Sequence, residues 1–169
     1  ERQVSEEDRH FNALARLGDG SLLLAGEGGT LLRSRDAGLN WEALSSPYGG
    51  SYFGVQSMPS GPVLIYGMRG TVLRSEDSGD NWQQLDSQGA GSLFASVLFN
   101  ETDVALLGQN GSLLFSRDGG LTFQRLPLAR SAMLTAGLSL TQPDKMLVLG
   151  DAGVLMVDLE VDGAAGEKQ

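Results

Sequence analysis

Three copies of one eight-residue motif constrain the fold of this chain more than any other feature of its sequence. The copies occupy residues 34–41, 75–82 and 116–123, and each reads Ser-x-Asp-x-Gly-x-Asn/Thr-aromatic. Their first residues are separated by equal intervals of 41 (75 − 34 and 116 − 75). Equal spacing means that whole structural units repeat without insertions, so the sequence predicts a repeat architecture.

The composition of the motif predicts a tight turn between two strands. An Asp side chain can accept hydrogen bonds from backbone N–H groups one to three residues further on, and the Gly can adopt a positive φ without a steric clash. The aromatic residue is expected to fold back from the next strand and cover the turn. The residues to which we assign this structural role are Ser34, Asp36, Gly38, Trp41, Ser75, Asp77, Gly79, Trp82, Ser116, Asp118, Gly120 and Phe123.

Short apolar runs around each motif predict four strands per unit, which is the size of one β-propeller blade. The predicted strands are 11–15, 21–26, 30–34 and 41–44 in the first unit, 52–55, 63–67, 71–75 and 82–85 in the second, 93–96, 104–108, 112–116 and 123–126 in the third, and 134–137, 145–150 and 154–157 in the fourth. The motif fails in the fourth unit, where Asp158-Leu159-Glu160-Val161 replaces it. We therefore expect an all-β protein with fifteen strands, the last blade being incomplete.

The expected organisation is one β-propeller-type domain, 10–161, between a polar leader, 1–9, and a polar tail, 162–169. Its blades are predicted at about 10–47, 51–88, 92–129 and 133–161. Two sets of small residues recur with the repeat: Ala13, Gly54, Ala95 and Ala136, then Gly26, Gly67, Gly108 and Gly150. We expect the first set where the innermost strands crowd toward a common axis, and the second at the end of each second strand.

The motif resembles the Asp box, or BNR repeat, of bacterial neuraminidases. Over residues 10–157 the pattern, clearest at 26–34 and 67–75, resembles the photosystem II stability/assembly factor family and its relatives in non-photosynthetic bacteria. The resemblance implies that the box is structural and joins the third and fourth strands of a blade. It further implies a non-catalytic scaffold that binds another protein during assembly and is exported to the periplasm or cell envelope. On this resemblance the chain corresponds to the C-terminal half of such a scaffold.

A blade without its outer strand predicts an unfinished ring. Two interpretations stay open beside a small closed ring of four blades: the chain is the C-terminal half of a longer propeller, or two copies associate as a homodimer to complete an eight-bladed ring. Both predict that the outward flanks of the first and fourth blades are apolar.

Charge and composition exclude several classes of function. The net charge of −9 argues against a nucleic-acid partner, which requires clustered Lys and Arg, and against docking on anionic lipid. No apolar run approaches the about 20 residues of a membrane-spanning helix, so no membrane insertion is expected. The chain has no Cys and a single His, His10, and its carboxylates lack the spacing of a calcium loop. We expect no metal and no cofactor.

The competing function is a glycoside hydrolase of sialidase type, or a carbohydrate-binding module. Sialidase chemistry requires an arginine cluster, a Tyr nucleophile with a Glu beside it, and an acid/base Asp. The available residues are Arg33, Arg69 and Arg74, Tyr48, Tyr52 and Tyr66, and Glu27. The Arg-Ile-Pro motif of sialidases is absent, so we expect no enzyme activity and no catalytic residue.

A protein partner is expected on the face opposite the Ser-x-Asp-x-Gly turns, where loops join the second and third strands and successive blades. The candidate residues are Glu27, Tyr48, Tyr52, Met68, Arg69, Gln109, Asn110 and Asp151, with the segment 127–130 beside them. Tyr48 and Tyr52 are aromatic anchors in this interpretation, and packing between blades is the alternative for Tyr52. Arg33 and Arg74 form a basic stripe, or else are solvated or bonded to Asp.

Overall fold

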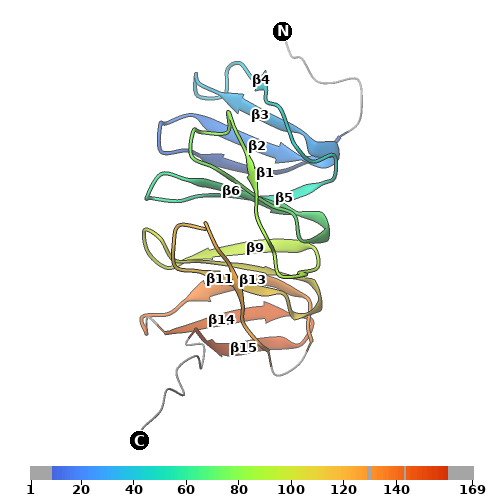
Figure 1. The fold of residues 1–169 in the computed structure, drawn as a ribbon, viewed down its shortest axis with the longest axis vertical. Helices are drawn as coiled ribbons and strands as arrows, with labels where there is room; N and C mark the ends of the chain where they lie inside the picture. The colour runs from blue at the N-terminus through green and yellow to red at the C-terminus, as the bar shows by residue number, and fades with distance from the viewer. Residues whose placement is uncertain (1–8, 129–130, 143, 160–169) are drawn as a thin grey trace, which may run out of the picture.

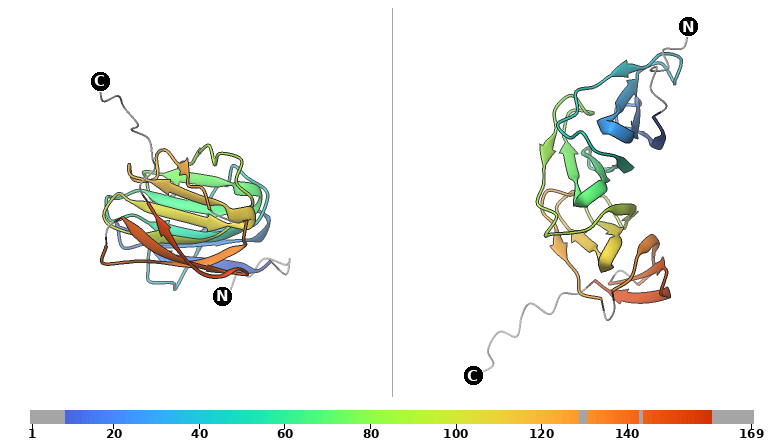
Figure 2. Two further views of the ribbon diagram at one scale, coloured as in Figure 1. Left: turned by 90° about the horizontal axis from the view of Figure 1, so that it is seen from below. Right: turned by 90° about the vertical axis from the view of Figure 1, so that its right-hand side faces the viewer.

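The computed structural model describes residues 9–128, 131–142 and 144–159, which form four antiparallel sheets arranged along an open arc (Figures 1 and 2). Each sheet is built from consecutive strands in chain order, as in the blades of a β-propeller. The first strands of the four blades lie beside one another on the concave side of the arc. The predicted all-β propeller architecture is therefore confirmed.

The fifteen predicted strands are present in the described part of the chain. They are β1 (Phe11–Arg16), β2 (Leu22–Gly26), β3 (Leu31–Ser34) and β4 (Glu42–Ala43) in blade 1, β5 (Tyr52–Ser57), β6 (Val63–Gly67), β7 (Val72–Ser75) and β8 (Gln83–Gln84) in blade 2, β9 (Leu93–Leu98), β10 (Val104–Gly108), β11 (Leu113–Ser116) and β12 (Gln124–Arg125) in blade 3, and β13 (Leu134–Ser139), β14 (Lys145–Gly150) and β15 (Gly153–Asp158) in blade 4. Three single 3-10 turns, η1 (Glu27–Gly29), η2 (Met68–Gly70) and η3 (Gln109–Gly111), join the second and third strands of blades 1 to 3.

The outer strands are shorter than predicted. Each contains two residues, against the four expected at 41–44, 82–85 and 123–126. Backbone pairing nevertheless continues one residue further, since Leu44 N donates to Leu31 O at 3.0 Å. The predicted leader up to residue 8, the segment 160–161 and the tail 162–169 lie outside the described residues, as do residues 129 and 130 of the segment 127–130.

The two ends of the blades differ in what they carry. We call the end with the Ser-x-Asp-x-Gly turns the turn end. The opposite end, with the 3-10 turns and the loops between blades, is the loop end. The loops between blades are tied to the 3-10 turns, since Gly29 N donates to Gly50 O at 2.8 Å and Gly111 N donates to Ala132 O at 2.7 Å.

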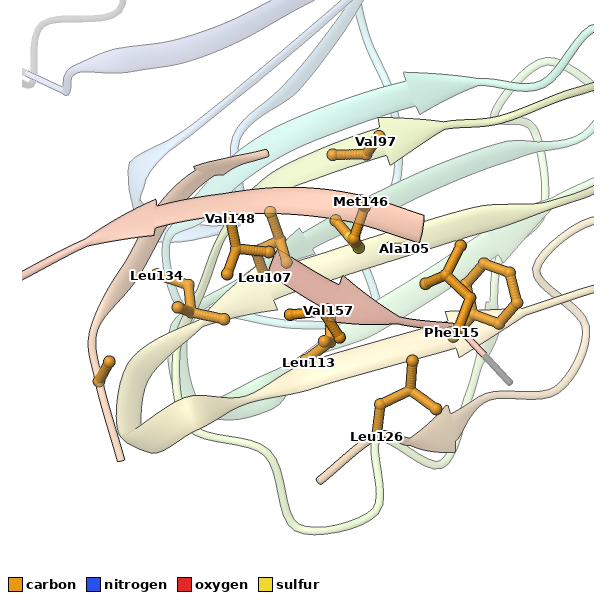
Figure 3. Packing of buried hydrophobic residues seen from close by; sticks show 12 residues of the cluster. Val97, Ala105, Leu107, Leu113, Phe115, Leu126, Leu134, Met146, Val148 and Val157 are labelled. Carbon is orange, nitrogen blue, oxygen red and sulfur yellow. The ribbon is translucent and has the colours of Figure 1, made fainter. Parts of the chain in front are cut away.

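In blades 2 and 3 the second strand is buried on both faces, and alternate side chains pack against different neighbours. In β6, Val63 and Ile65 belong to the core between blades 1 and 2, whereas Leu64 and Tyr66 belong to the core between blades 2 and 3. We call these the backward face and the forward face of a blade. Figure 3 shows the third such core, in which forward residues such as Leu107 pack against the backward face of blade 4.

The repeated small residues have clear steric reasons. Gly67 ends β6, and a Cβ there would collide with the backbone oxygen of Ser51; Gly26, Gly108 and Gly150 are equivalent. Ala13, Gly54, Ala95 and Ala136 lie on the innermost strands, as expected. The expected reason, crowding at the axis, is wrong, because these positions are on the forward face of each blade. Gly54, for example, pairs with Tyr66 in the ladder, and its missing Cβ leaves room for the Tyr66 ring.

The outward faces of the two end blades are apolar, as predicted. On the forward face of blade 4, Leu138, Val154 and Met156 are 57, 62 and 63 % exposed. On the backward face of blade 1, Leu14 is 61 % exposed and pairs in the ladder with the half-buried Leu24. Charged residues lie only at one end of these faces, Arg16 on blade 1 and the Lys145–Asp158 pair on blade 4. The arc thus ends in two largely apolar sheet faces, neither of which is covered by another described blade.

Candidate partner-binding site

The three Ser-x-Asp-x-Gly turns share one hydrogen-bond pattern. In the second turn, Ser75 Oγ donates to Asp77 Oδ1 at 2.8 Å and accepts from Gly79 N at 2.8 Å. Asp77 also accepts from the backbone and side chain of Asn81, both at 2.8 Å. The same contacts recur around Asp36 and Asp118. In all three turns the Asp accepts from the backbone N–H four residues on, one residue further than expected. At Asp118 it also accepts from Leu121 N, three residues on, as expected.

These hydrogen bonds favour the charged carboxylate. The backbone N–H of Asn40, then its side chain and Ser34, lower the pKa of Asp36 from its ordinary value of 3.8 to about 2. The side chain and backbone of Asn81 lower the pKa of Asp77. At Asp118 burial raises the pKa, but hydrogen bonds from Thr122 and Ser116 outweigh it and the pKa is lowered. All three act as acceptors within their own turns, which supports a structural role.

The turn requires two left-handed residues, of which the sequence predicted one. Gly79 has φ 93°, as expected, and Ser78 before it has φ 57°. Ala37 and Gly119 occupy the position of Ser78 with φ 59° and 69°. The aromatic residue covers the turn: Trp41 Nε1 donates to Gly38 O at 3.2 Å. In the third copy, where Phe123 replaces Trp, the aromatic ring is buried as well.

Arg33 and Arg74 are buried links between blades, not a basic stripe. Arg33 is 5 % exposed in its side chain and contacts Asp80 of the next blade at 2.7 Å, while Nη1 donates to Ser78 O at 3.1 Å. Arg74 Nε donates to Gly119 O, again in the next turn, at 3.1 Å. Of the two alternatives, bonding to Asp is thus realised at Arg33, and neither side chain is solvated. These contacts bring residues 45 positions apart together, which no local sequence pattern could show.

The loop end keeps one backbone shape and changes its side chains. The central residue of each 3-10 turn is left-handed: Gly28 has φ 59°, Arg69 φ 57° and Asn110 φ 55°. Arg69 and Asn110 are exposed at these tips. Within the described residues, neither side chain donates a hydrogen bond to another protein group. The backbone N–H of Arg69 donates to Ser92 Oγ at 3.2 Å.

Three of the predicted partner-binding residues line one shallow hollow. It has a volume of about 380 Å³ and lies between blades 3 and 4, lined by Gln109, Asn110, Ser131, Ala132, Met133 and Asp151. Asp151 Oδ1 accepts from Met133 N at 2.9 Å, which fixes the carboxylate at the rim, and Met133 is 41 % exposed. The hollow thus combines amide groups, one carboxylate and an apolar side chain. Ser131 and Met133 were not predicted, because their place depends on how the loop between the blades folds.

The other candidates have different surroundings. Glu27 pairs with His10 at 3.1 Å, and hydrogen bonds from the His10 backbone and side chain lower the pKa of Glu27. Tyr48 is half-buried and its hydroxyl donates to Met68 O at 3.3 Å. Tyr52 is fully buried, and its hydroxyl shares a 2.7 Å hydrogen bond with Ser46 Oγ. Tyr52 therefore packs between blades, the alternative stated for it, and it presents no surface to a partner.

The residues available for sialidase chemistry do not converge. Arg33 and Arg74 contact turns at the turn end, whereas Arg69 and Glu27 lie in the 3-10 turns of the loop end. Tyr66 is buried, and its hydroxyl donates to Ser96 Oγ at 3.1 Å. No cluster of three or more His, Asp or Glu side chains suited to a metal ion occurs within residues 9–128, 131–142 and 144–159. The described chain also contains no helix with the length and apolarity that crossing a bilayer requires.

Comparison with known proteins gives structural matches only. No protein-family model and no curated protein sequence matches the chain. Among solved structures, YCF48 bound to D1 peptide is 20 % identical with a TM-score of 0.67, over 93 % of this chain and 53 % of that one. YCF48 from Cyanidioschyzon merolae is 18 % identical with a TM-score of 0.66, over 86 % and 49 %. Virginiamycin B lyase from Staphylococcus aureus is 14 % identical with a TM-score of 0.68, over 95 % and 59 %.

These proteins share an architecture and differ in function. YCF48 is a photosystem II assembly factor, so the similarity expected from the motifs extends to the fold. Virginiamycin B lyase is an enzyme, so the fold alone does not decide between scaffold and catalyst. The chain is therefore similar in structure to YCF48-like β-propellers, and it spans about half the length of the YCF48 chains that it matches.

Proposed function

We propose that this chain is a non-enzymatic β-propeller scaffold whose loop end binds another protein. The observation that carries the proposal is the repeated left-handed tip. Gly28 occupies it without steric cost, whereas Arg69 adopts the same φ with a side chain, at a cost of about 1 kcal/mol. A long cationic side chain at a strained, exposed tip is typical of a recognition surface.

The hollow beside η3 suits a polypeptide segment. Gln109 and Asn110 offer amide donors and acceptors, Asp151 offers a carboxylate, and Met133 offers apolar contact. Peptide backbone requires alternating donors and acceptors, and such a mixed surface can supply them. The YCF48 structure with a bound D1 peptide supports the proposal, because a chain with this fold there binds a protein segment.

We propose that the protein acts in the assembly or stability of a complex in the periplasm or cell envelope, as the resemblance of its motifs to the assembly-factor family suggests. The hydrolase alternative is weaker, because the residues that it needs lie at opposite ends of the blades. Carbohydrate binding is tested separately, on a glycan array.

The test is selection of peptides from a displayed random library on the immobilised protein, followed by fluorescence anisotropy with the selected sequence. The variant Arg69→Ala/Asn110→Ala is expected to weaken peptide binding at least tenfold. The control, Arg35→Ala/Gln83→Ala, removes one cation and one amide from exposed positions beside the turn end, and should bind as the parent does.

Three results would overturn the proposal. They are turnover of a fluorogenic sialoside or other glycoside, selective binding on a glycan array without peptide binding, and peptide binding that only the control variant weakens.

A further inference from the structure

The two open ends of the arc are the two halves of a junction that the chain builds three times internally. Forward-face residues of β2, β6 and β10, among them Leu23, Leu64 and Leu107, are fully buried against the next blade. The ladder pairings place Leu147 and Leu149 of β14 at the same positions, because Gly150 ends β14 as Gly108 ends β10. Yet Leu149 is 40 % exposed.

The forward face of blade 4 is continuous. Cross-strand pairing aligns Leu138 with Leu147 and Leu147 with Met156, and a second row aligns Leu149 with Val154. These rows correspond to those of blade 3 that Figure 3 shows packed against blade 4. A sheet face of this kind is buried at every internal junction of the chain.

The backward face of blade 1 is the complementary half. Leu22 and Leu24 occupy in β2 the positions of Val63 and Ile65 in β6, which are 1 and 0 % exposed against the preceding blade. In blade 1 they are only half-buried. The chain therefore carries one forward face and one backward face of the same junction type, each without a described blade against it.

One pair of positions distinguishes a second copy from an unrelated partner. At the first internal junction, Arg33 of β3 contacts Asp80 in the next blade's turn at 2.7 Å. The equivalents at the open ends are Met156 of β15 and Leu39 of the first turn, 63 and 82 % exposed. The first internal junction therefore pairs two charged residues at these positions, whereas the open ends carry two apolar residues. The two ends thus match each other.

From this match we propose that two copies of the chain join head to tail, the forward face of blade 4 in each covering the backward face of blade 1 in the other. The result is a closed ring of eight blades with a two-fold axis through its centre, at the upper end of the usual propeller range of about four to eight. Burial of both apolar faces drives the association. The inference is independent of the loop-end proposal, since a monomer could still bind a peptide.

The test is the mass in solution by light scattering over a concentration series, with charge variants at the matched pair. The parent is expected at twice 17.9 kDa. Leu39→Asp and Met156→Arg should each raise the dimer dissociation constant at least tenfold, because each places an unpaired charge in an apolar contact. The double variant rebuilds the Arg33–Asp80 pair and should return to within about threefold of the parent.

Leu121→Asp is the matched control, since Leu121 is an exposed residue at the same turn position in blade 3 and should leave the dimer intact. Circular dichroism of each variant checks the fold. A monomeric parent at all concentrations, masses that grow beyond two copies, or a dimer that neither Leu39→Asp nor Met156→Arg weakens would each overturn the proposal.

Discussion

The turn end and the loop end repeat in opposite ways. At the turn end the same side chains make the same hydrogen bonds in three blades, as around Asp36 and Asp77. At the loop end the backbone repeats, with φ of 55 to 59° at the three tips, while the side chains change from Gly28 to Arg69 to Asn110. The side chains that repeat at the turn end build the fold. The side chains that vary at the loop end, on a backbone of constant shape, are free to recognise a partner.

The largest expected effect is at the turn end, where Arg33 links blades 1 and 2. Arg33→Ala should lower the free energy of unfolding by about 2 kcal/mol, because it removes charge-assisted hydrogen bonds to Asp80 and Glu42 and the bond to Ser78 O. The acceptors are half-exposed, so the cost is below that of a fully buried pair. Urea denaturation followed by circular dichroism measures it.

Arg35→Ala is the matched control for Arg33→Ala. Arg35 contacts the same Glu42 but is 57 % exposed in its side chain. Its loss should cost no more than about 0.5 kcal/mol. Equal effects of the two substitutions would mean that burial between blades adds nothing to the turn-end contacts.

A smaller loss is expected within a single turn. Asp77→Ala removes the acceptor for Ser75 and Asn81 and should cost about 1 kcal/mol, as loss of a comparable side-chain cap does. Peptide binding should be unchanged, because the turn lies at the opposite end from η2. If Asp77→Ala abolishes binding in a protein that remains folded, the division between the two ends is wrong.

The turns also predict a dependence of stability on pH. The pKa of Asp36 is about 2 in the folded protein, against its ordinary value of 3.8 in an unfolded chain. The unfolded chain therefore takes up protons first, and the stabilisation present above pH 4 is lost as pH falls toward 2. Asp36→Asn should be less stable than the parent at pH 7 and equal to it near pH 1.5. A constant difference across this range in urea titrations would rule out the carboxylate charge as the cause.

The smallest effect on stability is expected at the loop end. Arg69→Gly relieves a left-handed residue and should leave the free energy of unfolding unchanged or raise it by up to about 1 kcal/mol, while peptide binding falls. Arg35→Gly is the control at an ordinary backbone position and should be destabilising by about 0.5 kcal/mol. A marked loss of stability in Arg69→Gly would show that Arg69 serves the fold.

The repeat predicted most of the fold, because equal spacing and alternate apolar residues are local signals. All fifteen strands, the Gly38 and Gly79 turns and the apolar end faces followed from it. The short length of β4 could not be predicted in this way. Only Glu42 and Ala43 pair with β3, and the length of that pairing is not a local signal.

The site was predicted in part. The connections between second and third strands place Arg69, Asn110 and Asp151 at one end, as expected from their positions in the sequence. The contribution of Met133 and the burial of Tyr52 depend on packing between blades. Such contacts join residues far apart in sequence, so a local sequence motif does not predict them.

The most direct test of this account is hydrogen–deuterium exchange of the parent with and without a peptide selected from the library. We predict slower exchange in η2, η3 and the loop that contains Met133, with no change in the Ser-x-Asp-x-Gly turns. Protection confined to those turns, with the loop end unaffected, would contradict the account.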